Sequence, residues 1–250
     1  MFKNILITGA SSGLGKRLAI DFSNKGVNLF LFGRNEERLK DVVCVCEKRG
    51  AKVNYNMVDV RDKDKMKELI TDLDNKNNID LVIANAGISA GTFGGDEPNE
   101  DVYTIFDINI YGVLNTIEPL IPKMIERKKG QISIISSMSS FIGMSGCPAY
   151  SSSKSCVSHY GEALRGYLKQ YNIRVSVICP GFIRTPLTAK NKFAMPLIMD
   201  VDKASGIIKK GIVKNKGMIA FPFSIYILLK FIRLLPFDFV NYIFSKLPEK

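Results

Sequence analysis

The chain has 250 residues, of which 46% are hydrophobic and 24% are charged, and its formal net charge is +11. These totals are typical of a globular protein with a sizeable core. The positive charge suits anionic ligands or an anionic membrane surface, but the lysines are scattered and no basic stripe interleaves with aromatic residues, which argues against nucleic-acid binding.

The cysteines and the single histidine predict neither a disulfide framework nor a metal site. The five cysteines are odd in number and form no CxxC pair, and Cys44 and Cys46 fall two apart in a helical pattern, where they do not share a face. His159 alone cannot assemble a metal site and is expected in the core or in a subunit contact. The residues before Gly9 are too few for a secretory signal. We therefore expect free thiols, no metal and a cytoplasmic protein.

Short apolar runs along the chain predict seven β-strands separated by helical patterns. The strands are expected over residues 3–8, 27–32, 53–58, 79–84, 132–135, 175–179 and 218–221. The run 79–84 is nearly continuous, as in strands buried on both faces of a parallel sheet. The pattern predicts an α/β fold with a doubly wound, seven-stranded, mostly parallel sheet and helices on both of its faces.

A glycine-rich turn follows the first strand and precedes a helical pattern. Glycine permits a tight turn and a close approach of backbone to ligand, and a helix N-terminus offers free N–H groups and a positive dipole end. This context favours a pyrophosphate site over an ordinary strand–helix turn, the alternative for the same residues. The candidate binding residues here are Gly9, Ser11, Ser12, Gly13, Leu14 and Gly15.

Arg34 follows the second strand, where a carboxylate would hydrogen-bond the ribose hydroxyls of NAD. An arginine instead offers a charged fork to a 2′-phosphate. The sequence thus favours NADP(H) over NAD(H); the alternative is a solvated arginine at a helix start. Asn35 is expected to cap the next helix. Asp59, followed by Val60 at the end of the third strand, is expected either to accept from an adenine amino group or to cap the helix over 63–73.

Polar residues also follow the fourth strand and interrupt a long helical pattern. Asn85-Ala86-Gly87 ends the strand, and the glycine-rich segment 87–98 is expected to border a substrate cleft. Residues 101–124 form the long helical pattern, and Asn109 lies inside it. Because asparagine is a poor residue in mid-helix, Asn109 is expected to be either functional or a polar core contact.

Ser137, Tyr150 and Lys154 are the candidate catalytic residues. Tyr150 and Lys154 are four apart on a helical pattern and would share a face. A cation beside a phenol lowers its pKa, which makes Tyr150 a candidate general acid/base. Ser137 follows the apolar run 132–135 and is expected at a strand's carboxyl end, where ligands bind in open α/β sheets. The Tyr-x-x-x-Lys spacing alone is common, so its weight comes from the upstream motifs.

The chain is expected to form a single domain over residues 1–222, with residues 223–250 as an apolar helical extension of it. Residues 182–199, rich in Phe, Leu, Met and Pro without a clear period, predict either a mobile lid over an apolar ligand or a surface connection. Residues 202–213 predict an amphipathic helix before the last strand.

In their order and spacing, these motifs resemble those of the short-chain dehydrogenases/reductases up to about residue 220. The matching segments are 8–15, 59–60, 85–87, Asn109, 136–137, 150–154 and 180–185. The resemblance implies a Rossmann-like, NAD(P)-binding catalytic domain that assembles as a homodimer or homotetramer. Ser12 stands where some NADP-preferring relatives have a basic residue, so the expectation of NADP rests on Arg34.

The resemblance also implies a role for each matched residue. Tyr150 would exchange a proton with the substrate oxygen, and Ser137 would hydrogen-bond that oxygen. Lys154 would lower the Tyr150 pKa and hold the nicotinamide ribose, and Asn109 would hold a water that links Lys154 to solvent. Other implied nucleotide contacts are Gly9, Gly13 and Gly15 at the pyrophosphate, Asp59 and Val60 at the adenine, Asn85, Ala86 and Gly87 on the cofactor side, and Pro180, Gly181, Ile183 and Thr185 around the carboxamide.

The last thirty residues lie outside the matching motifs. Residues 224–235 predict a helix that is apolar on nearly all sides, and Lys230, Arg233 and Pro236 make it a poor transmembrane span. Such a helix must bury more than one face. Three burials remain open: against its own domain, against another subunit, or as a peripheral membrane contact through 224–244. The same surface could also lengthen a pocket for an apolar substrate.

The sequence therefore predicts an NADP(H)-dependent oxidoreductase that reduces the carbonyl of a small apolar substrate, or oxidises the matching alcohol, with Tyr150 as acid/base. The alternatives are a dinucleotide-binding regulator without turnover and a membrane-surface scaffold on the same fold. A pure binding module would not need Tyr150 at this position.

Overall fold

The computed structural model describes residues 2–89, 98–189, 191 and 193–245, and its centre is a seven-stranded sheet. The strands are β1 (Asn4–Thr8), β2 (Asn28–Gly33), β3 (Lys52–Met57), β4 (Leu81–Ala84), β5 (Gly130–Ile135), β6 (Ile173–Pro180) and β9 (Met218–Phe221). Their order is β3-β2-β1-β4-β5-β6-β9, and every neighbouring pair is parallel. The predicted seven-stranded, doubly wound sheet is confirmed.

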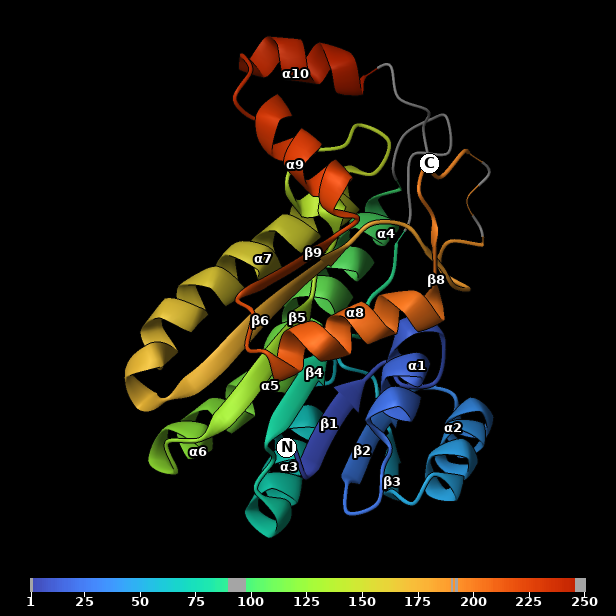
Figure 1. Cartoon of the computed structure of the whole chain (residues 1–250), viewed down its shortest axis with the longest axis vertical. Coiled ribbons are helices and arrows are strands. Elements are labelled where there is room, and N and C mark those ends of the chain that lie inside the picture. The colour runs from blue at the N-terminus through green and yellow to red at the C-terminus, as the bar shows by residue number, and fades with distance from the viewer. Residues whose placement is uncertain (1, 90–97, 190, 192, 246–250) are drawn as a thin grey trace.

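Helices cover both faces of this sheet (Figure 1). The helices α1 (Gly13–Phe22), α2 (Glu36–Lys48) and α8 (Val201–Val213) pack on one face, and α3 (Lys63–Asn77), α5 (Gly112–Ile117), α6 (Ile121–Glu126) and α7 (Pro148–Leu168) pack on the other. Ile5 and Ile7 of β1 belong to the first core and Leu6 to the second, because successive strand side chains point to opposite faces.

The strand order reverses between β1 and β4, and ligands of open α/β sheets bind in the crevice at such a reversal. Thr8 joins the two strand ends there. Its hydroxyl accepts from the backbone N–H groups of Asn85 at 3.1 Å and Ala86 at 3.2 Å, and the Asn85 side chain donates back to the Thr8 carbonyl at 2.9 Å. These bonds hold the glycine turn after β1 beside the end of β4.

The helical pattern expected over 101–124 is a run of five short elements rather than one helix. These are α4 (Asn99–Phe106), the π turn η1 (Asp107–Tyr111), α5, the 3₁₀ turn η2 (Glu118–Leu120) and α6. Asn109 lies in the π turn. A π turn inserts one residue into a helix and frequently marks a functional site.

The segment 182–199 contains a small parallel sheet formed by β7 (Ile183–Arg184) and β8 (Met199–Asp200), which the sequence did not predict. Whether the segment moves as a lid stays a prediction. In the glycine-rich segment 87–98, residues 90–97 lie outside the described part of the chain.

The tail forms two helices, α9 (Phe223–Ile232) and α10 (Phe237–Phe244), which Figure 1 shows at the upper end of the molecule. Leu229, Val240 and Phe244 form a small core with Met138, on the segment after β5. One side of the tail therefore packs on its own domain. Within the described residues, none of the helices has both the length and the apolar character needed to cross a membrane.

Candidate functional site

A cavity of about 850 Å³ lies at the carboxyl ends of the central strands. The predicted site residues that line it are Gly9, Ser11, Ser12, Gly13, Leu14, Arg34, Asp59, Val60, Asn85, Ala86, Gly87, Ser137, Tyr150, Lys154, Pro180, Gly181, Ile183 and Thr185. Gly15 and Asn109 are not among the lining residues. The fold thus gathers motifs from most of the chain length around one space.

The glycine turn fits a pyrophosphate in its backbone geometry. Gly9 and Gly13 have φ angles of +65° and +51°, in the left-handed region that favours glycine. At the cap of α1, Ser12 makes no side-chain cap hydrogen bond to described residues, so the first-turn amides remain for a ligand. Gly15 is packed against the turn, and its contact with a pyrophosphate stays a prediction. A Cβ there would lie 2.3 Å from the Gly9 carbonyl oxygen, so its absence lets α1 start against the turn.

Two arginines stand at the end of the cavity beyond the glycine turn. Arg34 and Arg38 both line it, and the sequence argument missed Arg38. Asn35 caps α2 as predicted, because its side-chain oxygen accepts from the Arg38 backbone N–H at 2.9 Å. This cap places the two guanidinium groups on the first turn of α2 and just before it. The sequence signal that could have identified Arg38 as a candidate is its place in the first helical turn after the predicted N-cap Asn35.

Asp59 lies between these arginines and a third. Its carboxylate receives a two-pronged hydrogen bond from Arg61 at 2.8 and 3.1 Å, and Arg34 lies 3.7 Å away. The hydrogen bond from Arg61 is the main cause of the lowered pKa of Asp59. The alternative that Asp59 caps α3 is wrong, because Asp62 is the cap and accepts from the Lys65 N–H at 3.1 Å. Asp59 lies too early in the chain to accept from the N–H groups in the first turn of α3.

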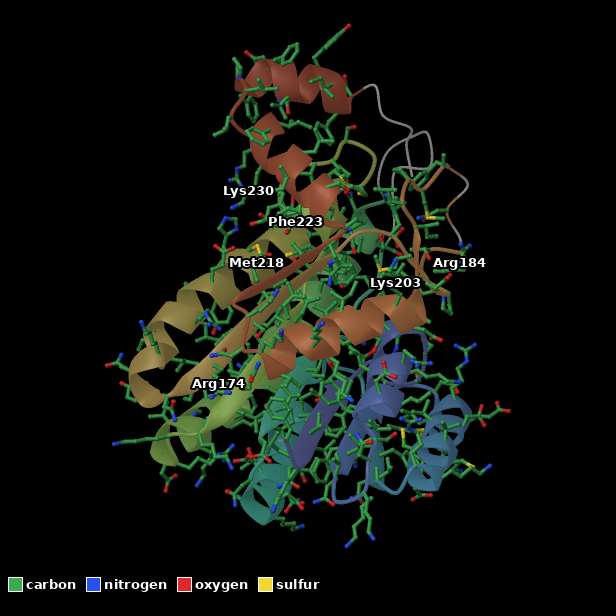
Figure 2. The ribbon with its side chains drawn as sticks, viewed as in Figure 1. Arg174, Arg184, Lys203, Met218, Phe223 and Lys230 are labelled. Atoms are coloured by element: carbon green, nitrogen blue, oxygen red, sulfur yellow. The ribbon has the colours of Figure 1, made fainter. Side chains whose placement is uncertain are left out.

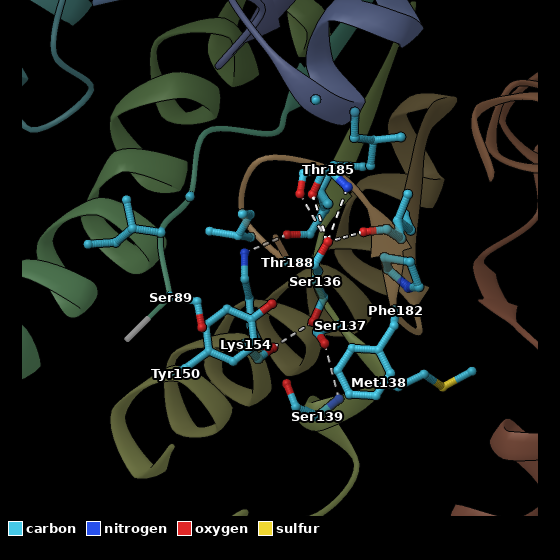
Figure 3. A pocket seen from close by; sticks show the side chains of 18 of the residues that line it. Ser89, Ser136, Ser137, Met138, Ser139, Tyr150, Lys154, Phe182, Thr185 and Thr188 are labelled. Carbon is cyan, nitrogen blue, oxygen red and sulfur yellow. Dashed lines mark hydrogen bonds between the residues drawn. The ribbon is translucent and has the colours of Figure 1, made fainter. Parts of the chain in front are cut away.

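Ser137, Tyr150 and Lys154 lie together in the cavity (Figure 3). Ser137 follows β5, where its hydroxyl accepts from the Ser139 N–H at 3.2 Å and is also hydrogen-bonded with the Tyr150 phenol. On α7, the Lys154 ammonium lies 5.9 Å from the centre of the Tyr150 ring and donates to the Ile135 carbonyl at 3.0 Å. The strand end and one helix face bring these three side chains together, as the spacing predicted.

Burial dominates the titration of this pair. It raises the pKa of Tyr150 to about 12, although the hydrogen bond with Ser137 opposes the shift. Burial lowers the pKa of Lys154 to about 8. The expected lowering of the Tyr150 pKa by Lys154 does not appear in this geometry, because the ammonium is bonded to the Ile135 carbonyl and desolvation of the phenol prevails. Tyr150 is therefore protonated at neutral pH and suited to donate a proton.

Asn109 lies directly behind the cavity wall and is fully buried. Its side chain accepts from the Ile88 N–H at 2.9 Å and donates to the Ile88 carbonyl and the Ser153 hydroxyl, both at 3.0 Å. A Cβ on Gly87 would lie 3.1 Å from the Asn109 oxygen and 3.2 Å from the Lys154 nitrogen. Asn109 is thus a polar core contact next to Lys154, and its function in a water relay stays a prediction.

The other end of the cavity is apolar and is formed mostly by two segments that the sequence analysis offered for this purpose, 182–199 and the tail. Its lining includes Met138, Met144, Phe182, Leu187, Phe193 and Leu197, together with Ile225, Leu228, Leu229, Ile232, Ile243 and Phe244 from the tail. The tail therefore forms one wall of the space that contains Tyr150. The signal in the sequence was the apolar helix itself, whose packing partner could not be identified.

Of the five cysteines and His159, Cys147 lines this cavity and the others do not. Among the described residues, which include all five cysteines, no disulfide is formed. His159 is exposed on α7, so a position in the core is wrong and a subunit contact stays a prediction. In the described ranges, no three His, Cys, Asp or Glu side chains gather where they could hold a metal ion.

Lys154→Met is expected to stabilise the fold by about 2 kcal/mol at pH 7, because it removes a buried charge and keeps an unbranched side chain. The pKa of Lys154 falls from 10.5 to about 8 on folding. The unfolded state therefore binds the proton more tightly, and the destabilisation is fully present below pH 8 and fades as the pH rises toward 10.5. Urea unfolding at pH 7 and pH 10 measures this.

The matched control is Lys169→Met, which replaces an exposed lysine just after α7 and should change stability by less than about 0.5 kcal/mol at either pH. The assignment of a buried, desolvated ammonium would be contradicted if Lys154→Met unfolded more easily than the wild type at pH 7. It would also be contradicted if the gain in unfolding free energy over the wild type grew as the pH rises.

Comparison with known proteins gives a consistent result. The family model for short chain dehydrogenase matches residues 3–195. An uncharacterized oxidoreductase of Myxococcus xanthus is 36% identical over 236 residues, which cover 94% of this chain and 93% of the relative. The 3-oxoacyl-acyl-carrier-protein reductase FabG of Thermotoga maritima is 33% identical over 189 residues, 75% of this chain and 77% of the relative.

Solved structures share the fold at lower identity. A short-chain dehydrogenase from Sphingobium yanoikuyae in complex with NADPH has a TM-score of 0.82 and 22% identity, covering 98% of this chain and 96% of that chain. A short-chain dehydrogenase/reductase from Burkholderia phymatum in complex with NAD has a TM-score of 0.84 and 20% identity, covering 93% of each chain. The chain therefore belongs to the short-chain dehydrogenase/reductase family and is an oxidoreductase that uses a nicotinamide dinucleotide to interconvert carbonyls and alcohols.

Proposed function

We propose that the protein is an NADPH-dependent reductase of an apolar ketone or aldehyde, which also oxidises the matching alcohol. The observation that carries the proposal is the continuity of the cavity. It begins at the glycine turn and the two arginines, passes Ser137, Tyr150 and Lys154, and ends between apolar side chains of the tail. One space thus offers sites for a dinucleotide, a proton donor and an apolar molecule in sequence.

The dinucleotide end supports NADPH over NADH. The backbone at Gly9, Gly13 and Leu14 would hold the pyrophosphate at the start of α1. Arg34 and Arg38 would bind the 2′-phosphate, and the structure places no carboxylate directly after β2, where Arg34 stands. The other predicted contacts are Asp59 and Val60 at the adenine, Lys154 at the nicotinamide ribose, and Ile183 and Thr185 at the carboxamide.

The protein's own residues would transfer the proton to the substrate oxygen and stabilise the charge that develops there. The bound cofactor supplies the hydride. The protonated Tyr150 phenol would donate its proton to the substrate oxygen, and the Ser137 hydroxyl would hydrogen-bond the same oxygen as its negative charge develops. The Lys154 ammonium, which donates to the Ile135 carbonyl in this structure, would stabilise the phenolate only after turning from that carbonyl toward the phenol oxygen. Asn109 would hold a water through which the returning proton reaches Lys154 from solvent.

The apolar end supports an apolar substrate, and a ketone series tests this. If the tail wall binds the substrate chain, kcat/KM for linear methyl ketones should rise about three- to fourfold per added methylene until the cavity is filled, since each buried methylene contributes about 0.8 kcal/mol. Oxidation of NADPH reports the rate.

The chain offers a matched pair of variants for this assay. Leu228→Ala shortens a side chain that lines the cavity and should flatten the series, whereas Leu234→Ala shortens one on the same helical extension that does not line it and should leave the series unchanged. Rates that stay level or fall with chain length in the wild type would remove the apolar substrate from the proposal.

We also propose that the protein works as a homodimer or homotetramer in a reducing compartment. Tyr103 on α4, Tyr111 at the end of η1 and Tyr167 on α7 are more than half exposed, which supplies apolar surface for a second copy. The five cysteines, none of them in a disulfide within the described residues, support the reducing compartment.

A further inference from the structure

We propose that the outer face of α9 and α10 docks on an anionic lipid bilayer and turns the mouth of the cavity toward it. An apolar carbonyl substrate would then enter from the membrane. The substrate part of this proposal depends on the proposed reductase function, whereas the docking itself does not.

The first observation is the concentration of exposed apolar side chains on the tail. Of the sixteen large hydrophobic side chains exposed in the described residues, eight fall between residues 223 and 242. They are Phe223, Leu228, Phe231, Leu234, Leu235, Phe237, Phe239 and Tyr242. Leu234 and Phe237 are 80% and 78% exposed. A patch of this kind on two neighbouring helices is typical of an interaction surface.

The second observation is that this surface is held in place. Leu229, Val240 and Phe244 pack on Met138, so the inner side of the two helices is fixed to the domain. The exposed side chains Phe223, Phe231 and Leu234 lie outside this small core, and Phe231 and Leu234 also border a hollow between α9 and α7. Figure 2 shows the side chains of both helices projecting from the upper end of the molecule. The apolar face is therefore a preformed platform.

The third observation is charge. Within the platform, Lys230 and Arg233 are exposed between the apolar residues, and Asp238 is the one acidic residue of α9 and α10. Apolar and aromatic side chains mixed with cations match an interface of acyl chains and anionic headgroups.

The fourth observation links the platform to the cavity. Leu228 is 56% exposed and also lines the cavity, so it stands at the rim. Leu187 and Leu197, on the segment 182–199, are 40% and 58% exposed and line the cavity as well. The rim therefore carries apolar side chains from two segments. A second protein bound here would close this entrance, whereas a bilayer would cover the same apolar area and supply an apolar solute through it.

Flotation with vesicles tests the docking without any turnover. The full-length protein is mixed with vesicles of phosphatidylcholine alone or of phosphatidylcholine with phosphatidylglycerol, and the bound fraction is measured. We expect at least about tenfold tighter binding to the phosphatidylglycerol vesicles, weakened by salt. Two variants should each lose most of this binding: Leu234→Ser with Phe237→Ser, which removes apolar area, and Lys230→Glu with Arg233→Glu, which reverses charge.

The matched control is Met57→Ser with Val213→Ser, two exposed apolar side chains on β3 and at the end of α8, outside the platform and the cavity. It should float like the wild type. Docking is wrong if the wild type does not float, or if the Leu234→Ser, Phe237→Ser protein floats equally well. It is also wrong if that variant changes only the molecular mass in solution, because the face would then be an interface between two copies.

A second readout separates this proposal from the reductase function. With a short, water-soluble ketone, the Leu234→Ser, Phe237→Ser variant should oxidise NADPH at the wild-type rate, since neither side chain lines the cavity. With a long-chain ketone dissolved in phosphatidylglycerol vesicles, its kcat/KM should fall about tenfold or more. An equal rate from vesicles overturns the entry of substrate from the membrane, whereas absence of turnover with every ketone overturns the reductase and leaves flotation to decide docking.

Discussion

Replacing Tyr150 with phenylalanine is expected to lower kcat by on the order of 10³-fold, within the range that a positioned general acid contributes. The substitution removes the oxygen that is hydrogen-bonded with Ser137 and keeps the ring, which is half-buried beside Lys154. The glycine turn and Arg34 are untouched, so NADPH should bind with nearly its original affinity. Steady-state turnover and a nucleotide-fluorescence titration measure the two quantities separately.

Tyr160→Phe is the matched control, because it makes the same change on the same helix. Its hydroxyl is hydrogen-bonded to Glu118 and it does not line the cavity, so turnover should remain at the wild-type level. Turnover of Tyr150→Phe within tenfold of the wild type would assign the proton transfer to another group. Loss of NADPH binding in that variant would show that the ring, rather than the oxygen, was the important part.

Arg34→Ser is expected to weaken NADPH binding by about tenfold to hundredfold and to leave NADH binding nearly unchanged. The reason is that one charge-assisted hydrogen bond contributes about 1.5–3 kcal/mol. Arg34 is the first residue after β2 and lines the cavity on the side of Asp59. The double variant Arg34→Ser, Arg38→Ser should lose more, since the second guanidinium lines the same end. Titrations of both nucleotides at two salt concentrations give the ratio.

Lys40→Ser controls for the general loss of positive charge. Lys40 is on α2 like Arg38, pairs with Glu36 at 2.9 Å and does not line the cavity. It should leave the ratio of the two affinities unchanged. If Arg34→Ser weakens both nucleotides equally, the arginine does not read the 2′-phosphate and the preference for NADPH is wrong.

The inner strands of the sheet could be predicted because they are largely apolar on both faces, whereas the edge strand β3 is partly exposed. Runs such as 79–84 can be buried only between two layers of helices, and the glycine turn marks where the first strand ends. The meeting of Ser137 with Tyr150 was also predictable. A strand's carboxyl end and one helix face are local properties, and the parallel sheet brings all such ends to one edge.

The remainder depended on packing between distant segments. No local signal shows that α9 and α10 fold back over Met138, because an apolar helix fits several partners equally well. The rise in the Tyr150 pKa was not predicted for the same reason. The four-residue spacing indicates a neighbouring cation, whereas desolvation depends on all the segments that enclose the phenol. The π turn at Asn109 was visible only as an asparagine in an unfavourable place.

The position of the tail has a consequence for how such an enzyme can diversify. The segment after β9 forms the cavity wall at the end away from the glycine turn. It follows an edge strand of the sheet, and its buried residues belong to neither of the two main cores. Exchanging the final 28 residues, 223–250, would therefore change the shape of the apolar end of the cavity. The glycine turn and the residues Ser137, Tyr150 and Lys154 would stay unchanged. Grafting the ends of related chains onto residue 222 is a direct route to new specificities.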